Sequence, residues 1–386
     1  MIRKAIFWLH LTCGVAAGVV VLMMSVTGVI LTYERQILAW EDQAYFADGE
    51  GQSKVPLETL IEQNSDADFT PQSVIIASDP AAPVVLRQGR SGEVIVNPYT
   101  GEVYEPHSDT IDSFFSTVTA WHRWFNVSGE GRANARAITG ISNLMFLFLI
   151  VSGIYLWLPA IYRWSTMRLR LWFHPNARSG QARDFNWHHV FGFWSAIPLA
   201  VVVATATVFN YSWANNLVYR LAGEEPPQRG ASSAQEVVIE APSDAQVLAL
   251  SEAVALAQPY SSQWKTMTIS VPDTESGTID IAIDEGNGGQ PQKRHNLSLN
   301  AYTGEEVSWV PFSQLSAGRQ ARSWVRFLHT GEALGLIGQT IAGLVSFTSI
   351  LMVWTGFALS WRRFARWLAR MRKQRNASAT LNTAPR

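Results

Sequence analysis

The sequence of 386 residues contains a single cysteine, Cys13. Intrachain disulfides are therefore excluded, and so is covalently attached c-type haem, which needs a C-x-x-C-H motif. The sequence also lacks a Walker motif and a G-x-G-x-x-G pattern at a strand–helix junction. ATP-driven transport and internal binding of NAD(P)H therefore have no support, because both depend on such glycine-rich loops.

Charged residues are missing from four long apolar segments. A helix of about 20 apolar residues is enough to cross the hydrocarbon core of a bilayer, so each segment is long enough to span it. Many of the 16 tryptophans flank these segments, as expected for the aromatic belt at a membrane interface. No small-x-small cleavage site follows the first segment, so we expect an uncleaved anchor. The predicted spans are Ile6–Thr32, Ala137–Ala160, Trp187–Trp213 and Leu334–Leu359.

Acidic residues are absent from the C-terminal tail 362–386, which carries eight Lys and Arg residues. The short loop 161–186 is also rich in arginine, whereas segment 34–112 holds fifteen Asp and Glu against four Lys and Arg. Positive residues gather on the cytoplasmic side of membrane proteins. We therefore expect a multi-pass protein of the bacterial inner membrane with both termini in the cytoplasm and two long segments in the periplasm.

The two outward segments share one pattern. Each has a predicted helix, Pro56–Gln63 or Asp244–Ala257, followed by short alternating runs and a Tyr-Thr-Gly turn. The runs that predict strands are VVLRQ, EVIVN, KTMTISV, TIDIAI and NLSLN. The predicted fold class is therefore an α-helical integral membrane protein with four transmembrane helices from a parallel internal duplication, and with two α+β periplasmic domains.

This pattern predicts the organisation of the whole chain. Each half contains a span, an outer domain and a second span, and the halves are joined by a basic loop. The predicted parts are transmembrane helix 1 (1–33), outer domain 1 (34–109), an interface helix with transmembrane helix 2 (110–160), the cytoplasmic loop (161–186), transmembrane helix 3 (187–213), outer domain 2 (214–315), an interface segment with transmembrane helix 4 (316–361) and the cytoplasmic tail (362–386).

Four histidines occupy equivalent positions in the two halves. His10 and His188 lie in the first turns of spans one and three, and His122 and His329 precede spans two and four. Ionisable groups in or beside membrane spans indicate function, and neutral imidazole is a common ligand of haem iron. We therefore expect two bis-histidine sites, with His10 and His188 near the cytoplasmic face and His122 and His329 near the outer face.

The sequence alone leaves other roles open for these residues. Interfacial histidines also anchor helices or hydrogen-bond to carbonyl groups, and His189 could be the ligand in place of His188. Arg123 and Arg326 could pair with haem propionates or extend toward lipid headgroups. Zinc and non-haem iron fit less well, because neither carboxylates nor cysteines accompany the four histidines.

The segments FWLHLTCG, NPYTGEV, WHRWF, VSGIYLW, NWHHVFGFW and LHTGEALGLIGQTIAGL resemble the PepSY-associated transmembrane family over nearly the whole chain. The resemblance implies an iron-regulated bacterial inner-membrane protein with PepSY-like outer domains. It further implies a ferric-siderophore reductase with two b-type haems, as in FoxB-like members, and His10, His122, His188 and His329 as axial ligands. Some relatives carry a fused flavin reductase domain, which this sequence lacks, so we expect a separate electron donor.

The resulting hypothesis is a transmembrane electron relay. A cytoplasmic donor or a quinol supplies electrons, and Fe(III) held by a siderophore in the periplasm is reduced and released as Fe(II). The alternatives are a haem-free PepSY scaffold that regulates a periplasmic protein and a component of siderophore or iron transport. The expected partners are the ferric siderophore, the electron donor and the lipid bilayer, and no nucleic acid.

Overall fold

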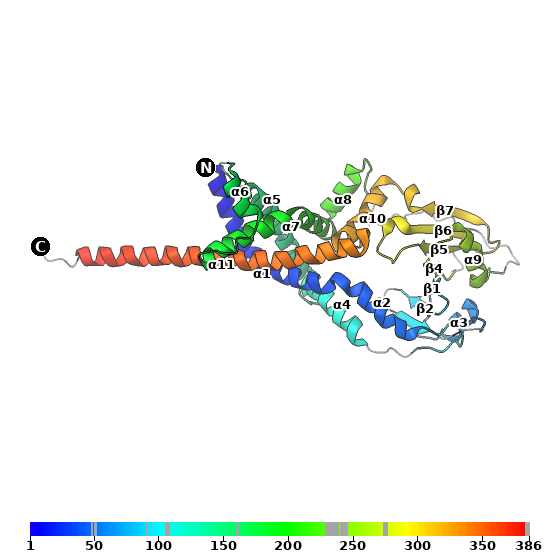
Figure 1. Cartoon of the computed structure of the whole chain (residues 1–386). Helices are drawn as coiled ribbons and strands as arrows, with labels where there is room; N and C mark the ends of the chain where they lie inside the picture. The colour runs from blue at the N-terminus through cyan, green and yellow to red at the C-terminus, as the bar shows by residue number, and fades with distance from the viewer. Residues whose placement is uncertain are drawn as a thin grey trace.

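The computed structural model describes residues 1–47, 49, 52–89, 92–104, 109–159, 162–227, 239, 246–272 and 277–382, without the side chains of residues 109 and 376–382. These residues form a helical bundle and a β-sheet at opposite ends of an elongated molecule (Figure 1). The N-terminus and the far end of the last helix lie at the end of the bundle remote from the sheet (Figure 1).

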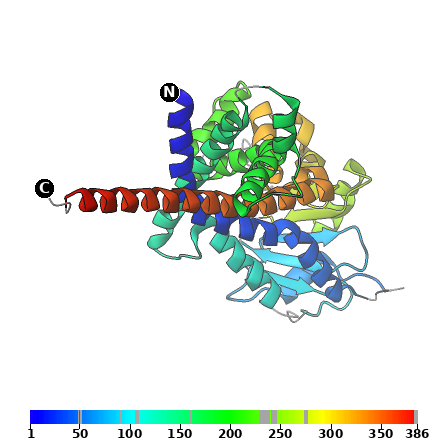
Figure 2. The ribbon, with the colours of Figure 1, turned by 60° about the vertical axis from the view of Figure 1, so that its left-hand side comes forward.

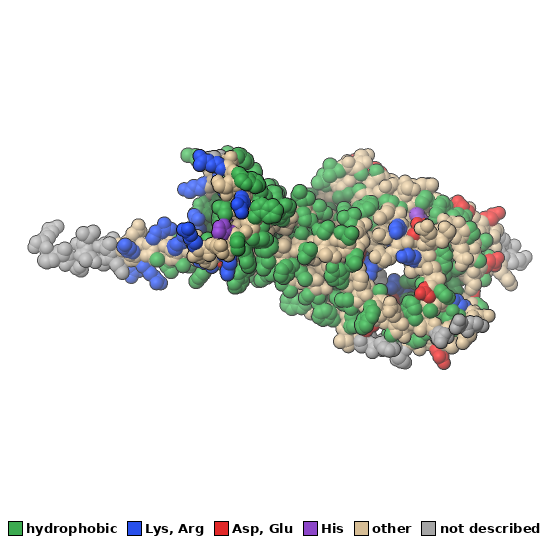
Figure 3. Space-filling view, in the orientation of Figure 1, with side chains coloured by type: hydrophobic (Ala, Val, Ile, Leu, Met, Phe, Trp, Pro, Cys, Tyr) green, Lys and Arg blue, Asp and Glu red, His purple; other side chains and the backbone are tan. Residues whose placement is uncertain are grey.

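Among the described residues, four helices are long and apolar enough to cross a membrane, which confirms the prediction of a helical membrane protein. A hydrophobic surface covers the bundle between an arginine-rich end and the sheet (Figure 3). The four long helices are α1 (Ile2–Ile30), α5 (Gly131–Trp157), α7 (Gly180–Asn210) and α11 (Gly335–Asn382).

The ends of these helices differ from the predicted spans. Helix α7 begins at Gly180 rather than Trp187, because the Ser179 hydroxyl caps its first turn by accepting a hydrogen bond from the Ala182 amide at 3.2 Å. Helix α11 continues well beyond Leu359 into the basic tail, where no proline or glycine interrupts it. Ala160, the predicted end of the second span, lies outside the described residues.

The four long helices form a closed arrangement in which α1 and α7 each pack against both α5 and α11. Helices α1 and α7, which carry His10 and His188, therefore occupy opposite corners. Small residues allow close packing of membrane helices. Gly18 of α1 shows this, because a Cβ atom there would lie 2.5 Å from the ring of Phe357 of α11.

Shorter helices cover the end of the bundle that faces the sheet (Figure 2). Helix α4 (Asp109–Trp124) packs against α1 and α5, whereas α10 (Ala317–Thr330) packs against α7 and α8 (Ser212–Leu221). Helix α2 (Glu34–Glu41) continues from α1 toward the sheet, and α6 (Trp164–Leu171) lies at the opposite end beside α7. Helices α4 and α10 carry the second pair of histidines.

The sheet has seven antiparallel strands in the order β3-β2-β1-β4-β5-β6-β7. The sequence runs predict β2 to β6 but not β1, whose residues are almost all apolar, nor β7, although Glu306 to Trp309 do alternate. The strands are β1 (Ser73–Ala77), β2 (Val84–Gln88), β3 (Gly92–Val96), β4 (Thr266–Ser270), β5 (Thr278–Asp284), β6 (Arg294–Asn300) and β7 (Glu306–Pro311).

The two outer segments, which the sequence analysis treats as separate domains, contribute to one sheet and one core. Strand β1 of the first segment pairs with β4 of the second, with Val74 opposite Ile269. Helices α3 (Leu57–Gln63) and α9 (Leu250–Ala257) bury their apolar side chains in the same core. This pairing removes two exposed sheet edges. The predicted helix 244–257 begins at Leu250, and residues 244 and 245 lie outside the described part.

Candidate functional site

The histidines at the end remote from the sheet are each held by a hydroxyl group on a neighbouring helix. The Nδ1 atom of His10 on α1 lies 2.8 Å from Ser152 Oγ on α5. The Nδ1 atom of His188 on α7 lies 3.0 Å from Thr355 Oγ1 on α11. Each imidazole is therefore oriented by a helix other than its own.

The histidines at the sheet end have matching contacts. The Nδ1 atom of His122 on α4 lies 2.9 Å from Thr27 Oγ1 on α1. The Nδ1 atom of His329 on α10 lies 3.3 Å from Thr205 Oγ1 and 2.9 Å from the Val202 carbonyl oxygen, both on α7. The ring centres of His122 and His329 are 6.3 Å apart, so these two imidazoles share one site.

The four hydroxyl groups determine which nitrogen of each histidine carries hydrogen. A hydroxyl has a single hydrogen to donate, and each of these donates it to a carbonyl oxygen four residues earlier in its own helix. The hydroxyl must then accept from the histidine, so Nδ1 carries hydrogen and Nε2 has a lone pair. The hydroxyl-to-carbonyl distances are 2.8 Å for Thr27, 2.6 Å for Ser152, 2.7 Å for Thr205 and 2.8 Å for Thr355.

Glycines beside three of these hydroxyl residues lie next to the imidazole rings. A Cβ atom at Gly28, Gly153 or Gly356 would lie 3.4–3.6 Å from the Cε1 atom of the histidine held there. The fourth hydroxyl residue, Thr205, is followed by Ala206. The Thr-Gly and Ser-Gly pairs can be seen in the sequence as repeated dipeptides. Only the structure shows that their hydroxyl groups are partners of the histidines.

The Nε2 atoms are the free atoms of these imidazoles. Within the described ranges, no protein group hydrogen-bonds to Nε2 of His10, His122, His188 or His329. The pKa of His122 is lowered to about 4, first by burial and then by the nearby His329 and Arg123. The imidazole is therefore neutral at pH 7, the form that can bind a metal.

His189 has different surroundings from His188. Its Nδ1 atom hydrogen-bonds to the Phe185 carbonyl of its own helix at 2.8 Å, and its ring packs on the Phe185 ring at 4.1 Å. Of these two adjacent histidines, only His188 is held by a hydroxyl group on another helix. The contact that orients His10, His122 and His329 is therefore shared by His188 and not by His189.

The two sites are well separated along the bundle. His10 and Thr27 are 17 residues apart in α1, as are His188 and Thr205 in α7. At about 1.5 Å per residue this spacing corresponds to about 25 Å. The region between the sites is filled by apolar side chains, which include Ala17, Val21, Phe146, Ile150, Leu199 and Val203.

The predicted arginines Arg123 and Arg326 lie beside the histidines of the sheet end. The Arg123 guanidinium lies 4.7 Å from the centre of the Trp124 ring. Its pKa is lowered by burial and by the positive charges of Arg136, Arg132 and Arg326. Arg132 and Arg136 are not among the site residues predicted from the sequence.

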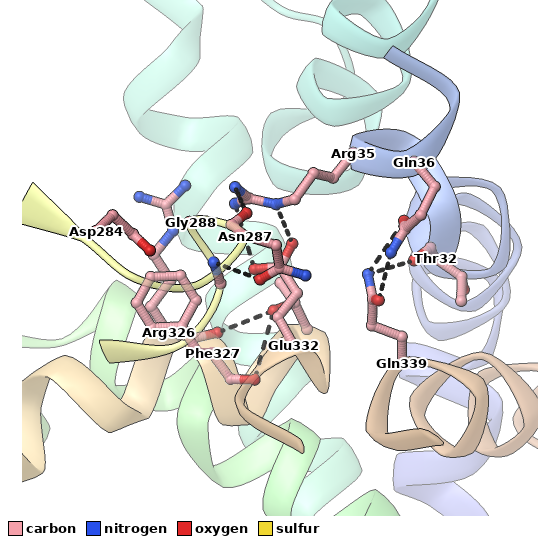
Figure 4. A network of polar contacts seen from close by, with 12 residues as sticks. Thr32, Arg35, Gln36, Asp284, Asn287, Gly288, Arg326, Phe327, Glu332 and Gln339 are labelled. Atoms are coloured by element: carbon pink, nitrogen blue, oxygen red, sulfur yellow. Dashed lines mark hydrogen bonds and ion pairs between the residues drawn. The ribbon is translucent and has the colours of Figure 1, made fainter. Parts of the chain in front are cut away.

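A polar network joins the sheet to the membrane helices at this end (Figure 4). Arg35 Nε lies 3.0 Å from the buried carboxylate of Glu332, and its Nη1 donates to the Asn287 carbonyl at 3.0 Å. Gln36 Nε2 donates to Gln339 Oε1 at 2.6 Å. Glu332 is three residues from His329 in the sequence, so this network fixes the turn between the histidine helix and α11.

Replacing Arg35 with Ala should leave the Glu332 carboxylate buried without its partner. We expect a loss of about 2 kcal/mol in the free energy of unfolding, less than for a fully buried pair because 35% of the Arg35 side chain is exposed. Thermal unfolding in detergent measures this loss. The double variant with Glu332→Ala should recover part of it, and additive losses in the double variant would show that the two side chains do not interact.

Comparison with known protein families identifies the family of this chain. The model of the PepSY-associated TM region matches residues 7–363, a range that includes all four histidines and all seven strands. The chain belongs to the PepSY-associated transmembrane family. This confirms the resemblance seen in the sequence motifs. Among curated proteins, none matches the chain significantly.

In this PepSY-associated protein the histidines occur in pairs rather than in a larger group. Within the residues that the structure describes, no three His, Cys, Asp or Glu side chains gather to hold a bare metal ion. Each pair consists of residues from different helices, His10 with His188 and His122 with His329. Paired imidazoles with free Nε2 atoms could hold a group that supplies its own remaining ligands, such as haem.

Proposed function

We propose that this PepSY-associated protein is a ferric-siderophore reductase of the bacterial inner membrane that holds two haem b groups. The observation that carries the proposal is the common orientation of the four histidines. In each, a hydroxyl group on another helix holds Nδ1 and leaves Nε2 free. Such outer hydrogen bonds orient metal-binding histidines and raise their basicity.

The dimensions of the sheet-end site support haem as the bound group. Two imidazoles that bind one metal ion, with metal–nitrogen distances of about 2 Å, can have ring centres about 6 Å apart. The ring centres of His122 and His329 are separated by 6.3 Å. His10 and His188 would hold the second group. When bound, haem b supplies an iron that changes its charge by one electron, with a potential set by its ligands and surroundings.

The charge distribution supports an orientation with both termini in the cytoplasm and the sheet in the periplasm. Lys and Arg gather at the end of the bundle that holds the termini, and Asp and Glu lie on the sheet (Figure 3). The matching contacts of His10 with His188, and of His122 with His329, also support a parallel internal duplication. Electrons would enter at the arginine-rich end and leave at the sheet end.

The protein's own residues orient the ligands and exclude water between the sites. His188 is the proposed ligand rather than His189, because only His188 has the hydroxyl partner. The apolar residues between α1, α5, α7 and α11 keep the path between the sites free of water. Arg123 and Arg326 carry the positive charges that would pair with haem propionates.

Anaerobic reoxidation of the reduced protein tests this function. The purified protein is reduced with dithionite, freed of excess reductant and mixed with a ferric siderophore in the presence of an Fe(II) chelator. We expect the α-band of reduced haem b to disappear while one Fe(II) forms for each haem. A coloured protein that stays reduced would exclude the siderophore as acceptor, and a colourless protein would favour the haem-free scaffold.

A further inference from the structure

Three arginines gather around Arg123 beside the histidine pair at the sheet end, and we call the four residues the outer arginine cluster: Arg123, Arg132, Arg136 and Arg326. Arg123 follows His122 directly, and Arg326 precedes His329 by one helical turn. Arg132 and Arg136 lie in the first turns of α5. Three helices therefore bring positive charge to one place.

Aromatic rings and backbone oxygens hold these arginines, rather than carboxylates. The guanidinium groups of Arg123 and Arg132 lie 4.7 Å and 3.9 Å from the centre of the Trp124 ring. The Nη2 atom of Arg136 donates a hydrogen bond to the Phe209 carbonyl at 2.8 Å. In the part of the chain that the structure describes, none of the four arginines forms an ion pair, although Glu130 directly precedes α5.

Such a cluster is electrostatically unfavourable without an anion. The guanidinium groups of Arg123 and Arg132 lie over the same Trp124 ring, so like charges are close together. The positive-inside tendency does not account for them, because the proposed orientation places them at the outer face. Although the Glu34 carboxyl lies near Arg326, the arrangement favours the binding of an anion.

We infer that Arg132 and Arg136 bind the anionic groups of the ferric chelate, and that the protein prefers acceptors with net negative charge over cationic ones. This inference rests on the proposed function and specifies its substrate class. Arg123 and Arg326 are adjacent to the histidines and are assigned to haem propionates, whereas Arg132 and Arg136 lie on α5 and are exposed. Planar guanidinium groups bind carboxylates through two parallel hydrogen bonds.

Binding of redox-inert gallium chelates tests the inference without any electron transfer. The full-length protein in nanodiscs of neutral lipid is titrated calorimetrically with gallium(III) citrate, which is anionic, and with gallium(III) desferrioxamine B, which is cationic. We expect the anionic chelate to bind more tightly. Arg132→Gln and Arg136→Gln should each weaken its binding about fivefold, the upper value for one exposed charge pair.

Two control variants separate the charge from other effects. Arg136→Lys keeps the charge and should bind gallium(III) citrate nearly as the wild type does, even if its contact with Phe209 is lost. Arg220→Gln removes an exposed arginine of α8, outside the cluster, and should bind normally. A loss in Arg136→Gln together with normal binding in Arg136→Lys therefore supports a role for charge rather than for folding.

Several results would overturn the inference. One is equal binding of the two gallium chelates with no effect of Arg132→Gln or Arg136→Gln. Another is loss of citrate binding by the wild type in nanodiscs that contain phosphatidylglycerol, which would identify lipid headgroups as the anion. The haem spectrum keeps this test distinct from the proposed function: a coloured protein without charge preference loses only this inference, and a colourless protein that binds gallium(III) citrate loses only the relay.

Discussion

Replacing His329 with Ala is expected to lower the haem content from two groups to one per chain and to abolish reduction of ferric siderophore. The variant loses one of two imidazoles whose ring centres are 6.3 Å apart, while the four membrane helices keep their own packing. It should therefore still reach the membrane. A pyridine haemochrome assay on the purified variant measures haem per chain, and anaerobic mixing with a ferric siderophore measures the reduction.

His189→Ala is the matched control for this experiment. It removes an imidazole that lies beside a proposed ligand but hydrogen-bonds only to its own helix. We expect it to retain both haems and its activity. Two haems in His329→Ala, or one haem in His189→Ala, would contradict the assignment of ligands.

Replacing Thr355 with Val should weaken haem binding by His10 and His188, at the end of the bundle remote from the sheet. The valine has nearly the same shape but cannot accept the hydrogen bond from His188 Nδ1, which Thr355 accepts at 3.0 Å. Loss of such a supporting hydrogen bond typically weakens metal binding about 10–100-fold. We therefore expect part of the haem at this site to be lost during purification. The haem that remains at this site should have a shifted reduction potential, which spectroscopic titration measures.

Thr355→Ser provides the control because it keeps the hydroxyl group. A serine, Ser152, already has the matching role beside His10. Its haem content and potential should stay near those of the wild type. If Thr355→Val also behaves as the wild type, the hydroxyl group does not support His188. If both variants lose haem, the packing of the threonine methyl group rather than its hydrogen bond matters.

The membrane helices and the histidines could be predicted from the sequence because their signals are local. A run without charges indicates a span, and the equal spacing of His10 to Thr27 and of His188 to Thr205 shows the relation between the halves. The partners of the histidines could not be predicted, because each hydroxyl lies on a helix distant in the sequence. The 142 residues that separate His10 from Ser152 illustrate this.

The pairing of the two outer segments in one sheet also could not be predicted from the sequence. Pairing of β1 with β4 depends on contacts between residues almost 200 positions apart, such as Val74 and Ile269.

The turn after His122 is a further feature that the sequence does not predict, because Phe125 and Asn126 both adopt positive φ values, 58° and 57°. Asn adopts this left-handed conformation more readily than most residues, but Phe rarely does, so the conformation of Phe125 is imposed by the surrounding structure.

An optical spectrum of the detergent-purified protein, oxidised and then reduced with dithionite, shows directly whether the protein holds haem. It should be combined with a pyridine haemochrome count per chain. We predict a sharp α-band of reduced haem b and about two haems per chain, one for each of the two histidine pairs. A protein that remains colourless after expression with added haem would contradict it.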